Sequence, residues 1–107
     1  MTVLVTGGGG FLGRGVVARL LERGEHVRVL ARGEYPDLVK RGAEVMRGDV
    51  RDPVAVARAV EGAFGIVHTA ARVGYWGRYE EFYETNVVGT RTLIEAARSA
   101  NVARFVY

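Results

Sequence analysis

The sequence predicts an α/β domain in which helices cover a parallel sheet. Strand-like apolar segments alternate with segments whose apolar residues recur at the period of one helix face, and glycines mark the short joints. Such alternation produces right-handed crossovers between parallel strands. A chain of 107 residues, 49% hydrophobic and 25% charged, is long enough for one compact domain with a core.

The first half of the chain predicts three strands and two helices. The first helix, from Phe11 to Arg23, carries apolar residues at 12, 16, 17, 20 and 21, and Gly24 follows as its C-terminal cap. The other elements are the strands Val3–Thr6, His26–Arg32 and Ala43–Met46 and a weaker helix, Pro36–Arg41.

The second half begins with a helix start at Asp52-Pro53, where the carboxylate is the N-cap and proline stands in the first turn. This helix ends near Glu61 and is closed by Gly62. The remaining elements are the strand Phe64–Thr69, a glycine- and aromatic-rich loop at Arg72–Arg78, a long helix at Tyr79–Ala100 capped by Asn101, and the strand Arg104–Tyr107.

Composition excludes several classes of function. The net charge is +3, but the fourteen arginines are spread along the chain and interleaved with acids, so we expect no nucleic-acid partner. The absence of cysteine excludes disulfides and thiolate metal sites, and we expect no metal. The sequence shows neither a membrane-spanning apolar run nor a signal peptide, so we expect a cytoplasmic protein.

Between Val5 and Gly15 the sequence reads VTGGGGFLGRG, and six of these eleven residues are glycine. Glycine loses the most chain entropy on ordering, so the run needs a reason. It lies where the first strand turns into the first helix, and Gly8-x-Gly10-x-x-Gly13 matches the dinucleotide fingerprint, in which a tight turn brings a pyrophosphate to a helix N-terminus. The alternative is a glycine loop without a ligand.

The residue that contacts the adenosine ribose is expected about 20 positions further on, at the end of the second strand. The sequence there is Ala31-Arg32-Gly33. A guanidinium cannot accept hydrogen bonds from ribose hydroxyls, but it pairs well with a 2′-phosphate. Arg32, with Arg14 beside the glycine turn, therefore favours NADP over NAD. The alternative for Arg32 is a solvated arginine at a strand end.

Four segments carry a family resemblance that covers essentially the whole chain: Thr6-Gly7-x-x-Gly10-Phe11-Leu12-Gly13, Gly48-Asp49-Val50-Arg51-Asp52, His68-Thr69-Ala70-Ala71 and Asn86-Val87-Val88-Gly89-Thr90. With them the chain resembles the N-terminal part of an extended short-chain dehydrogenase/reductase of the NAD-dependent epimerase/dehydratase superfamily. The resemblance implies a Rossmann-type doubly wound sheet in the order 3-2-1-4-5, truncated after the fifth strand, with residues 1–107 as an NAD(P)-binding domain of a longer protein.

Two further segments narrow the resemblance. Ala70-Ala71-Arg72-Val73-Gly74-Tyr75-Trp76-Gly77 and Phe82-Tyr83-Glu84-Thr85-Asn86 are similar to the 3β-hydroxysteroid dehydrogenase branch. That branch includes sterol-4α-carboxylate dehydrogenases and 2-alkyl-3-oxoalkanoate reductases.

The resemblance also implies a set of cofactor contacts. The pyrophosphate turn would be lined by Gly7, Gly10, Phe11, Leu12 and Gly13. Asp49 would accept a hydrogen bond from the adenine amino group and Val50 would lie at the same ring. Small residues Thr69, Ala70 and Ala71 would let the backbone pass close to the cofactor, with a further contact at Thr85 beside a structural or proton-relaying Asn86.

Several of these residues have a structural alternative. The alternative for Asp49 is a cap of its own loop, and the alternative for Asn86 is a hydrogen bond to a neighbouring backbone group within its helix. His68, within an apolar strand, is interpreted as a buried neutral histidine rather than a ligand or base. Tyr75 and Trp76 either border a substrate pocket or pack within their loop.

The family's chemistry requires a tyrosine and, four residues later, a lysine that lowers the tyrosine pKa from its ordinary value near 10. No tyrosine here has such a lysine, since Lys40 is the only one. We therefore expect a fragment with no catalytic residue, which turns over no substrate by itself, binds cofactor weakly and tends to self-associate through its open sheet edge.

The leading hypothesis is the NADP-binding region of an oxidoreductase that transfers hydride between nicotinamide and a 3-hydroxy or 3-oxo carbon of a sterol-like or β-keto lipid. NAD remains a possible cofactor. The alternatives are a nucleotide-sugar epimerase or dehydratase, which Arg32 disfavours, and a non-catalytic dinucleotide-binding module.

Overall fold

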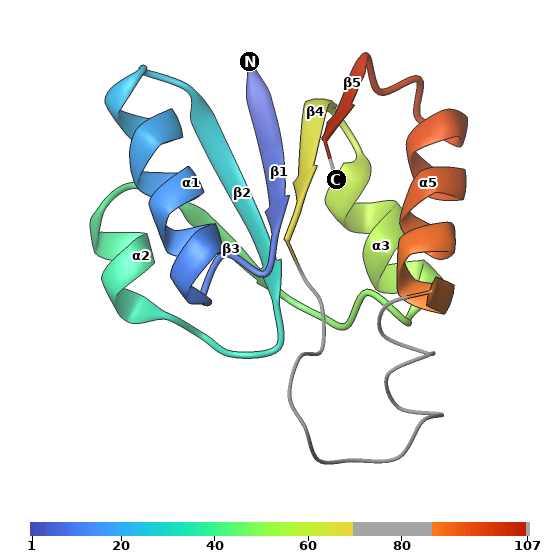
Figure 1. Cartoon of the computed structure of the whole chain (residues 1–107), viewed down its shortest axis with the longest axis horizontal. Coiled ribbons are helices and arrows are strands. Elements are labelled where there is room, and N and C mark those ends of the chain that lie inside the picture. The colour runs from blue at the N-terminus through green and yellow to red at the C-terminus, as the bar shows by residue number, and fades with distance from the viewer. Residues whose placement is uncertain (70–86, 107) are drawn as a thin grey trace.

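A parallel five-stranded sheet in the order β3-β2-β1-β4-β5 forms the centre of the computed structural model, which describes residues 1–69 and 87–106 (Figure 1). The strands are β1 (Thr2–Thr6), β2 (His26–Ala31), β3 (Glu44–Arg47), β4 (Ala63–His68) and β5 (Arg104–Val106). The predicted fold class and strand order are confirmed.

Parallel register brings the carboxyl ends of β1, β2 and β4 to the same side of the sheet, here called the carboxyl edge. Thr6 at the end of β1 pairs with Leu30 on β2 and with His68 on β4. From β1 the chain crosses to β2 on one side and later to β4 on the other, so the strand order reverses at β1. The carboxyl edge at such a switch point is where open α/β sheets bind ligands.

Helices cover both faces of the sheet. Figure 1 shows α1 (Phe11–Glu22) and α2 (Pro36–Lys40) on one face and α3 (Pro53–Val60) and α5 (Gly89–Ser99) on the other. Because successive strand residues point to opposite faces, Val5 packs with Val17 of α1, whereas Leu4 packs with Val56 of α3 and Leu93 of α5. All five side chains are completely buried.

The predicted caps are present. Gly24, Gly62 and Asn101 adopt left-handed backbone conformations after α1, α3 and α5, and the Asp52 carboxylate accepts a hydrogen bond from the Val54 amide at 3.0 Å. After α1, the amides of Gly24 and Glu25 donate to carbonyls within the last helical turn, as in a Schellman motif. Within residues 1–69 and 87–106, no helix is long and apolar enough to cross a membrane.

Most predicted boundaries hold to within one or two residues, and the clearest correction concerns the third strand. It was expected at 43–46 and lies at Glu44–Arg47. The Ala43 amide donates to the Leu38 carbonyl at 3.1 Å, so Ala43 closes the turn after α2 instead of joining the sheet. The expected start of the long helix at Tyr79 lies outside the described residues, and its described α-helical part begins at Gly89.

Candidate cofactor site

The glycine run forms a tight turn between β1 and α1. Gly7 has a left-handed φ of 73°, and its carbonyl accepts a hydrogen bond from the Gly10 amide at 3.0 Å. A Cβ on Gly13 would lie 2.0 Å from the Gly7 carbonyl oxygen, so backbone fills the place of a side chain. At Gly8, a Cβ would instead meet Val29 side-chain atoms of the core at 2.7 Å. The turn therefore depends on Gly7 and Gly13, with Gly8 needed for packing.

The N-terminus of α1 presents unpaired donors at the carboxyl edge. The Arg14 amide begins the helical pattern by donating to the Gly10 carbonyl at 2.8 Å. The amides of Phe11, Leu12 and Gly13 find no acceptor in the described part of the chain, and no side chain caps the helix. Such amides, together with the positive end of the helix dipole, favour an anion.

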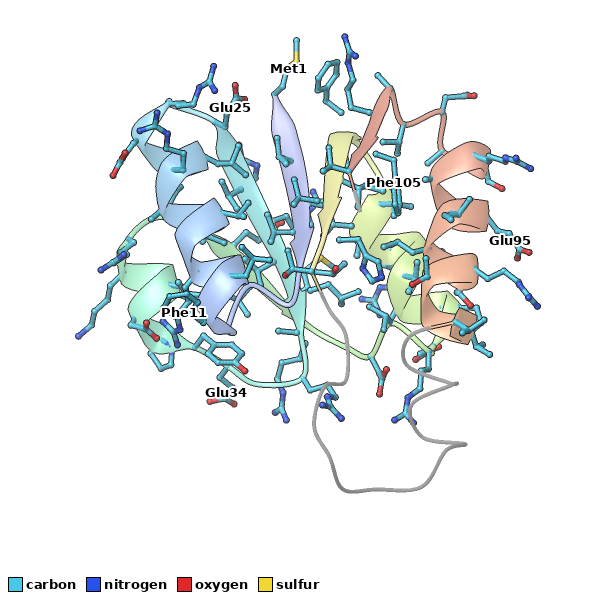
Figure 2. The ribbon with its side chains drawn as sticks, viewed as in Figure 1. Met1, Phe11, Glu25, Glu34, Glu95 and Phe105 are labelled. Atoms are coloured by element: carbon cyan, nitrogen blue, oxygen red, sulfur yellow. The ribbon has the colours of Figure 1, made fainter. Side chains whose placement is uncertain are left out.

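The side chains of Phe11 and Leu12 do not fill this space. They are 99% and 67% exposed. Figure 2 shows Phe11 at the same end of the molecule as Glu34, with Met1 and Glu25 at the opposite end. The turn thus fits a pyrophosphate bound through backbone amides, because these donors have no acceptor within residues 1–69 and 87–106 and the glycines allow close contact.

Arg32 follows β2 at the same edge, and its side chain is exposed. Three other arginines nearby each pair with an acid: Arg14 with Asp37, Arg47 with Glu34 at 3.5 Å, and Arg51 with Asp49 at 2.7 Å. Arg32 makes no ion pair with any residue that the structure describes.

Asp49 organises the loop after β3. Its carboxylate accepts a hydrogen bond from the Arg51 amide at 2.9 Å and forms an ion pair with the Arg51 guanidinium. The side-chain hydrogen bond from Arg51 is the main reason why the pKa of Asp49 lies below its ordinary value. The loop-capping alternative is thus present in the structure. The Val50 side chain is buried in the core beside Leu30, so contact with adenine at this position would involve its backbone.

Thr69 and His68 join β4 to β1. The Thr69 hydroxyl and amide both donate to the Thr6 carbonyl, at 2.5 and 3.1 Å. His68 is 5% exposed, with Nδ1 2.6 Å from the Thr6 hydroxyl and Nε2 2.9 Å from the Thr90 hydroxyl. Burial lowers its pKa, so the imidazole is neutral at pH 7, as the sequence predicted.

Four of the residues predicted from the family motifs lie in the segment between β4 and α5 that the structure does not describe. Ala70, Ala71, Thr85 and Asn86 lie outside the described residues, as do the loop aromatics Tyr75 and Trp76.

Sequence reasoning missed one residue at this edge. Tyr35 stands before α2 with a left-handed φ of 47°, and its ring lies against Gly9 and Gly33. The Arg14 guanidinium carbon lies 5.4 Å from the ring centroid. Arg14, expected to assist at a 2′-phosphate, is paired here with Asp37 and donates to the Gly9 carbonyl. No local pattern in the sequence indicates this arrangement.

Comparison with known proteins identifies one matching family and several similar proteins. Residues 3–107 match the model of the NAD dependent epimerase/dehydratase family. The chain is 44% identical to 2-alkyl-3-oxoalkanoate reductase from Stenotrophomonas maltophilia, over 100% of this chain and 32% of that protein. It is 41% identical to a 3β-hydroxysteroid dehydrogenase/Δ5→4-isomerase from Mycobacterium tuberculosis, over 98% of this chain and 30% of that protein.

A solved structure shares the arrangement of the sheet and helices. The structure of Thermus thermophilus UDP-glucose 4-epimerase in complex with NAD superimposes with a TM-score of 0.86 at 35% identity, covering 100% of this chain and 37% of that one. The chain spans about a third of the length of these relatives. The family resemblance drawn from the sequence motifs is confirmed. The chain belongs to the NAD dependent epimerase/dehydratase family.

Proposed function

We propose that this chain is the NADP-binding region of an oxidoreductase that transfers hydride between nicotinamide and a 3-hydroxy or 3-oxo carbon of a sterol-like or β-keto lipid. The observation that carries the proposal is the glycine turn at the carboxyl edge, where the amides of Phe11, Leu12 and Gly13 have no acceptor among the described residues. The names of the reductase and hydroxysteroid dehydrogenase relatives support the substrate class. When bound, the cofactor supplies the hydride chemistry, and the protein supplies binding and orientation.

Each part of the dinucleotide has a proposed set of partners. The backbone of Gly7, Gly10, Phe11, Leu12 and Gly13 holds the pyrophosphate, because amides and a helix N-terminus stabilise its charge. The contacts proposed on the adenosine side and along β4 are Arg32 at the ribose, Asp49 and Val50 at adenine, and Thr69, Ala70, Ala71 and Thr85 along the remainder.

The preference for NADP rests on Arg32. Its neighbours Arg14, Arg47 and Arg51 each form an ion pair with an acid. Arg32 forms no ion pair with a described residue, and the Asp49 carboxylate, which Arg51 already holds, is near enough only for a weaker charge interaction with Arg32. A 2′-phosphate would give it a partner, and a guanidinium forms strong charge-assisted hydrogen bonds with phosphate oxygens. The ribose hydroxyls of NAD offer it weaker, uncharged acceptors.

Calorimetric titration with NADP and NAD tests the proposal. We expect Arg32→Asp to weaken NADP binding by at least roughly ten- to a hundredfold, as for the loss of a hydrogen bond to a charged group. NAD binding should not weaken, because a carboxylate at this position accepts hydrogen bonds from the ribose hydroxyls. Arg23→Asp changes the net charge equally at the far end of α1 and is the matched control.

Two results contradict different parts of the proposal. An unchanged ratio of NADP to NAD affinity in Arg32→Asp removes Arg32 from the site. Failure of the unsubstituted protein to bind either dinucleotide removes the cofactor site altogether.

A nucleotide-sugar epimerase is the second candidate, favoured by the similarity to the Thermus thermophilus UDP-glucose 4-epimerase. Activity assays on the complete gene product that contains these residues distinguish the two candidates. Oxidation of NADPH with a 2-alkyl-3-oxo acid, or reduction of NADP with a 3-hydroxysteroid, supports the oxidoreductase. Interconversion of UDP-glucose and its 4-epimer without net change in the dinucleotide supports the epimerase.

A further inference from the structure

The ring of Tyr35 occupies room that two glycines leave open. A Cβ on Gly9 would lie 2.2 Å from Cζ and 2.6 Å from the hydroxyl oxygen of Tyr35. A Cβ on Gly33 would lie 2.9 Å from Cε2 and 3.2 Å from the same oxygen. The far end of the ring, with its hydroxyl, therefore takes the place of side chains at both positions.

These two glycines bracket the place of the adenosine ribose in the proposed site. Gly9 directly precedes Gly10 of the phosphate turn, and Gly33 directly follows Arg32 at the end of β2. In a dinucleotide fold the ribose lies between the pyrophosphate at the first helix and the residue that ends the second strand. The Tyr35 hydroxyl thus lies between the two groups proposed to hold the phosphates and the 2′ position.

We infer that Tyr35 is a specificity-determining residue, whose phenol hydroxyl donates a hydrogen bond to the 2′-phosphate of the adenosine ribose. The hydroxyl lies at this position because Gly9 has no side chain to occupy the space. This inference rests on the proposed dinucleotide site. A phenol is a neutral donor, and a phosphate oxygen is a strong acceptor. Tyr35 therefore adds a directional contact to the charge of Arg32.

The surroundings of Tyr35 hold the ring in this position. A left-handed φ is uncommon for an aromatic residue, and here it accompanies the start of α2, where the Leu38 amide donates to the Tyr35 carbonyl at 3.0 Å. Arg14 approaches the ring while it donates to the Gly9 carbonyl at 2.9 Å and pairs with Asp37. Strained backbone of this kind is commonly kept at functional sites. In this arrangement Arg14 positions the phenol beside the glycine turn.

Two nucleotides that differ only at the 2′ position give the test: 5′-AMP and 2′,5′-ADP (adenosine 2′,5′-bisphosphate), titrated calorimetrically into the protein. Tyr35→Phe removes the hydroxyl alone. Gly9→Ala places a methyl group where the far end of the Tyr35 ring lies, and a side-chain end can move away from it. Gly15→Ala, with nothing within 4 Å of the added Cβ, is the matched control.

The readout is the ratio of the affinities for 2′,5′-ADP and 5′-AMP. We expect Tyr35→Phe and Gly9→Ala each to lower this ratio about tenfold, the equivalent of 1.4 kcal/mol. The double variant should lower it no further, because both substitutions remove the same hydroxyl. Gly15→Ala should leave it unchanged.

Failure of the inference about Tyr35 and failure of the proposed function give different results in this test. If the unsubstituted protein binds both nucleotides but does not prefer 2′,5′-ADP, or if Tyr35→Phe keeps the original ratio, the inference is wrong while the dinucleotide site stands. An additive loss in the double variant likewise overturns it, since the two positions then act separately. If neither nucleotide binds, the proposed function itself fails.

Discussion

Replacing Gly13 by alanine should damage the glycine turn more than any other single methyl group. The new Cβ would lie 2.0 Å from the carbonyl oxygen and 2.6 Å from the carbonyl carbon of Gly7, and 2.8 Å from the Cα of Gly8. All three atoms belong to the backbone and cannot rotate away, so the turn must open. Opening it also breaks the 3.0 Å hydrogen bond from the Gly10 amide to the Gly7 carbonyl.

The expected cost follows from these contacts. Forcing an extra methyl group into a packed site costs about 1–3 kcal/mol, and a clash with backbone belongs at the upper end. The lost hydrogen bond and the better helix propensity of alanine are each worth about 1 kcal/mol and nearly cancel. We therefore expect Gly13→Ala to lower the free energy of unfolding by about 3 kcal/mol, a large share of the 5–15 kcal/mol typical of a domain.

Urea unfolding followed by circular dichroism measures this loss, and calorimetric titration with 5′-ADP measures the turn's ability to bind a diphosphate. Gly15→Ala, two residues further along α1 and with nothing within 4 Å of the added Cβ, should instead stabilise the protein by about 0.5–1 kcal/mol. A Gly13→Ala protein with the original stability and the original 5′-ADP affinity would refute the reasoning, because the turn would then tolerate a side chain.

Two further predictions concern stability. Because burial holds the pKa of His68 below its ordinary 6.5, the unfolded chain takes up a proton before the folded one does. The free energy of unfolding should therefore fall as the pH drops from about 6.5 toward the pKa of His68 in the folded protein. His68→Gln should make the free energy of unfolding, measured with urea at a series of pH values, less dependent on pH in this range. An equal slope in the variant would mean that His68 is not the group responsible. Asp52→Ala removes the N-cap of α3 and should cost about 1 kcal/mol in the same assay, whereas Asp52→Asn should cost only a few tenths; equal losses in both would mean that the carboxylate charge and not the cap matters.

Local patterns were sufficient to predict most of the fold. The period-3.6 spacing in α1, the left-handed caps at Gly24 and Gly62 and the Asp52-Pro53 helix start all depend on residues a few positions apart. Parallel pairing then follows from strand–helix alternation, since crossovers of this length are right-handed. The strand order 3-2-1-4-5 was predicted from the family resemblance and not from the alternation, because other parallel orders have the same alternation. The glycine turn was predicted for the same reason, because its conformation is decided within Gly7–Gly13.

The contacts of the candidate site were less predictable. Arg14 was expected at a 2′-phosphate and lies paired with Asp37, 23 residues away. Asp49 was assigned to adenine and is also engaged by Arg51, two residues on. An exposed arginine pairs with whichever acid the loops bring within reach. The spacing of apolar residues in the sequence does not determine the conformation of those loops.

The sequence by itself determined the order of the elements, the tight turn after β1 and the unpaired amides at the start of α1, because each depends on backbone conformation over a few neighbouring residues. Only the tertiary structure decided that Tyr35 lies over Gly9 and that His68 bonds the hydroxyl of Thr6, 62 residues away. Those contacts depend on strand register and on how α2 returns to the sheet edge, which are set by packing of the whole core.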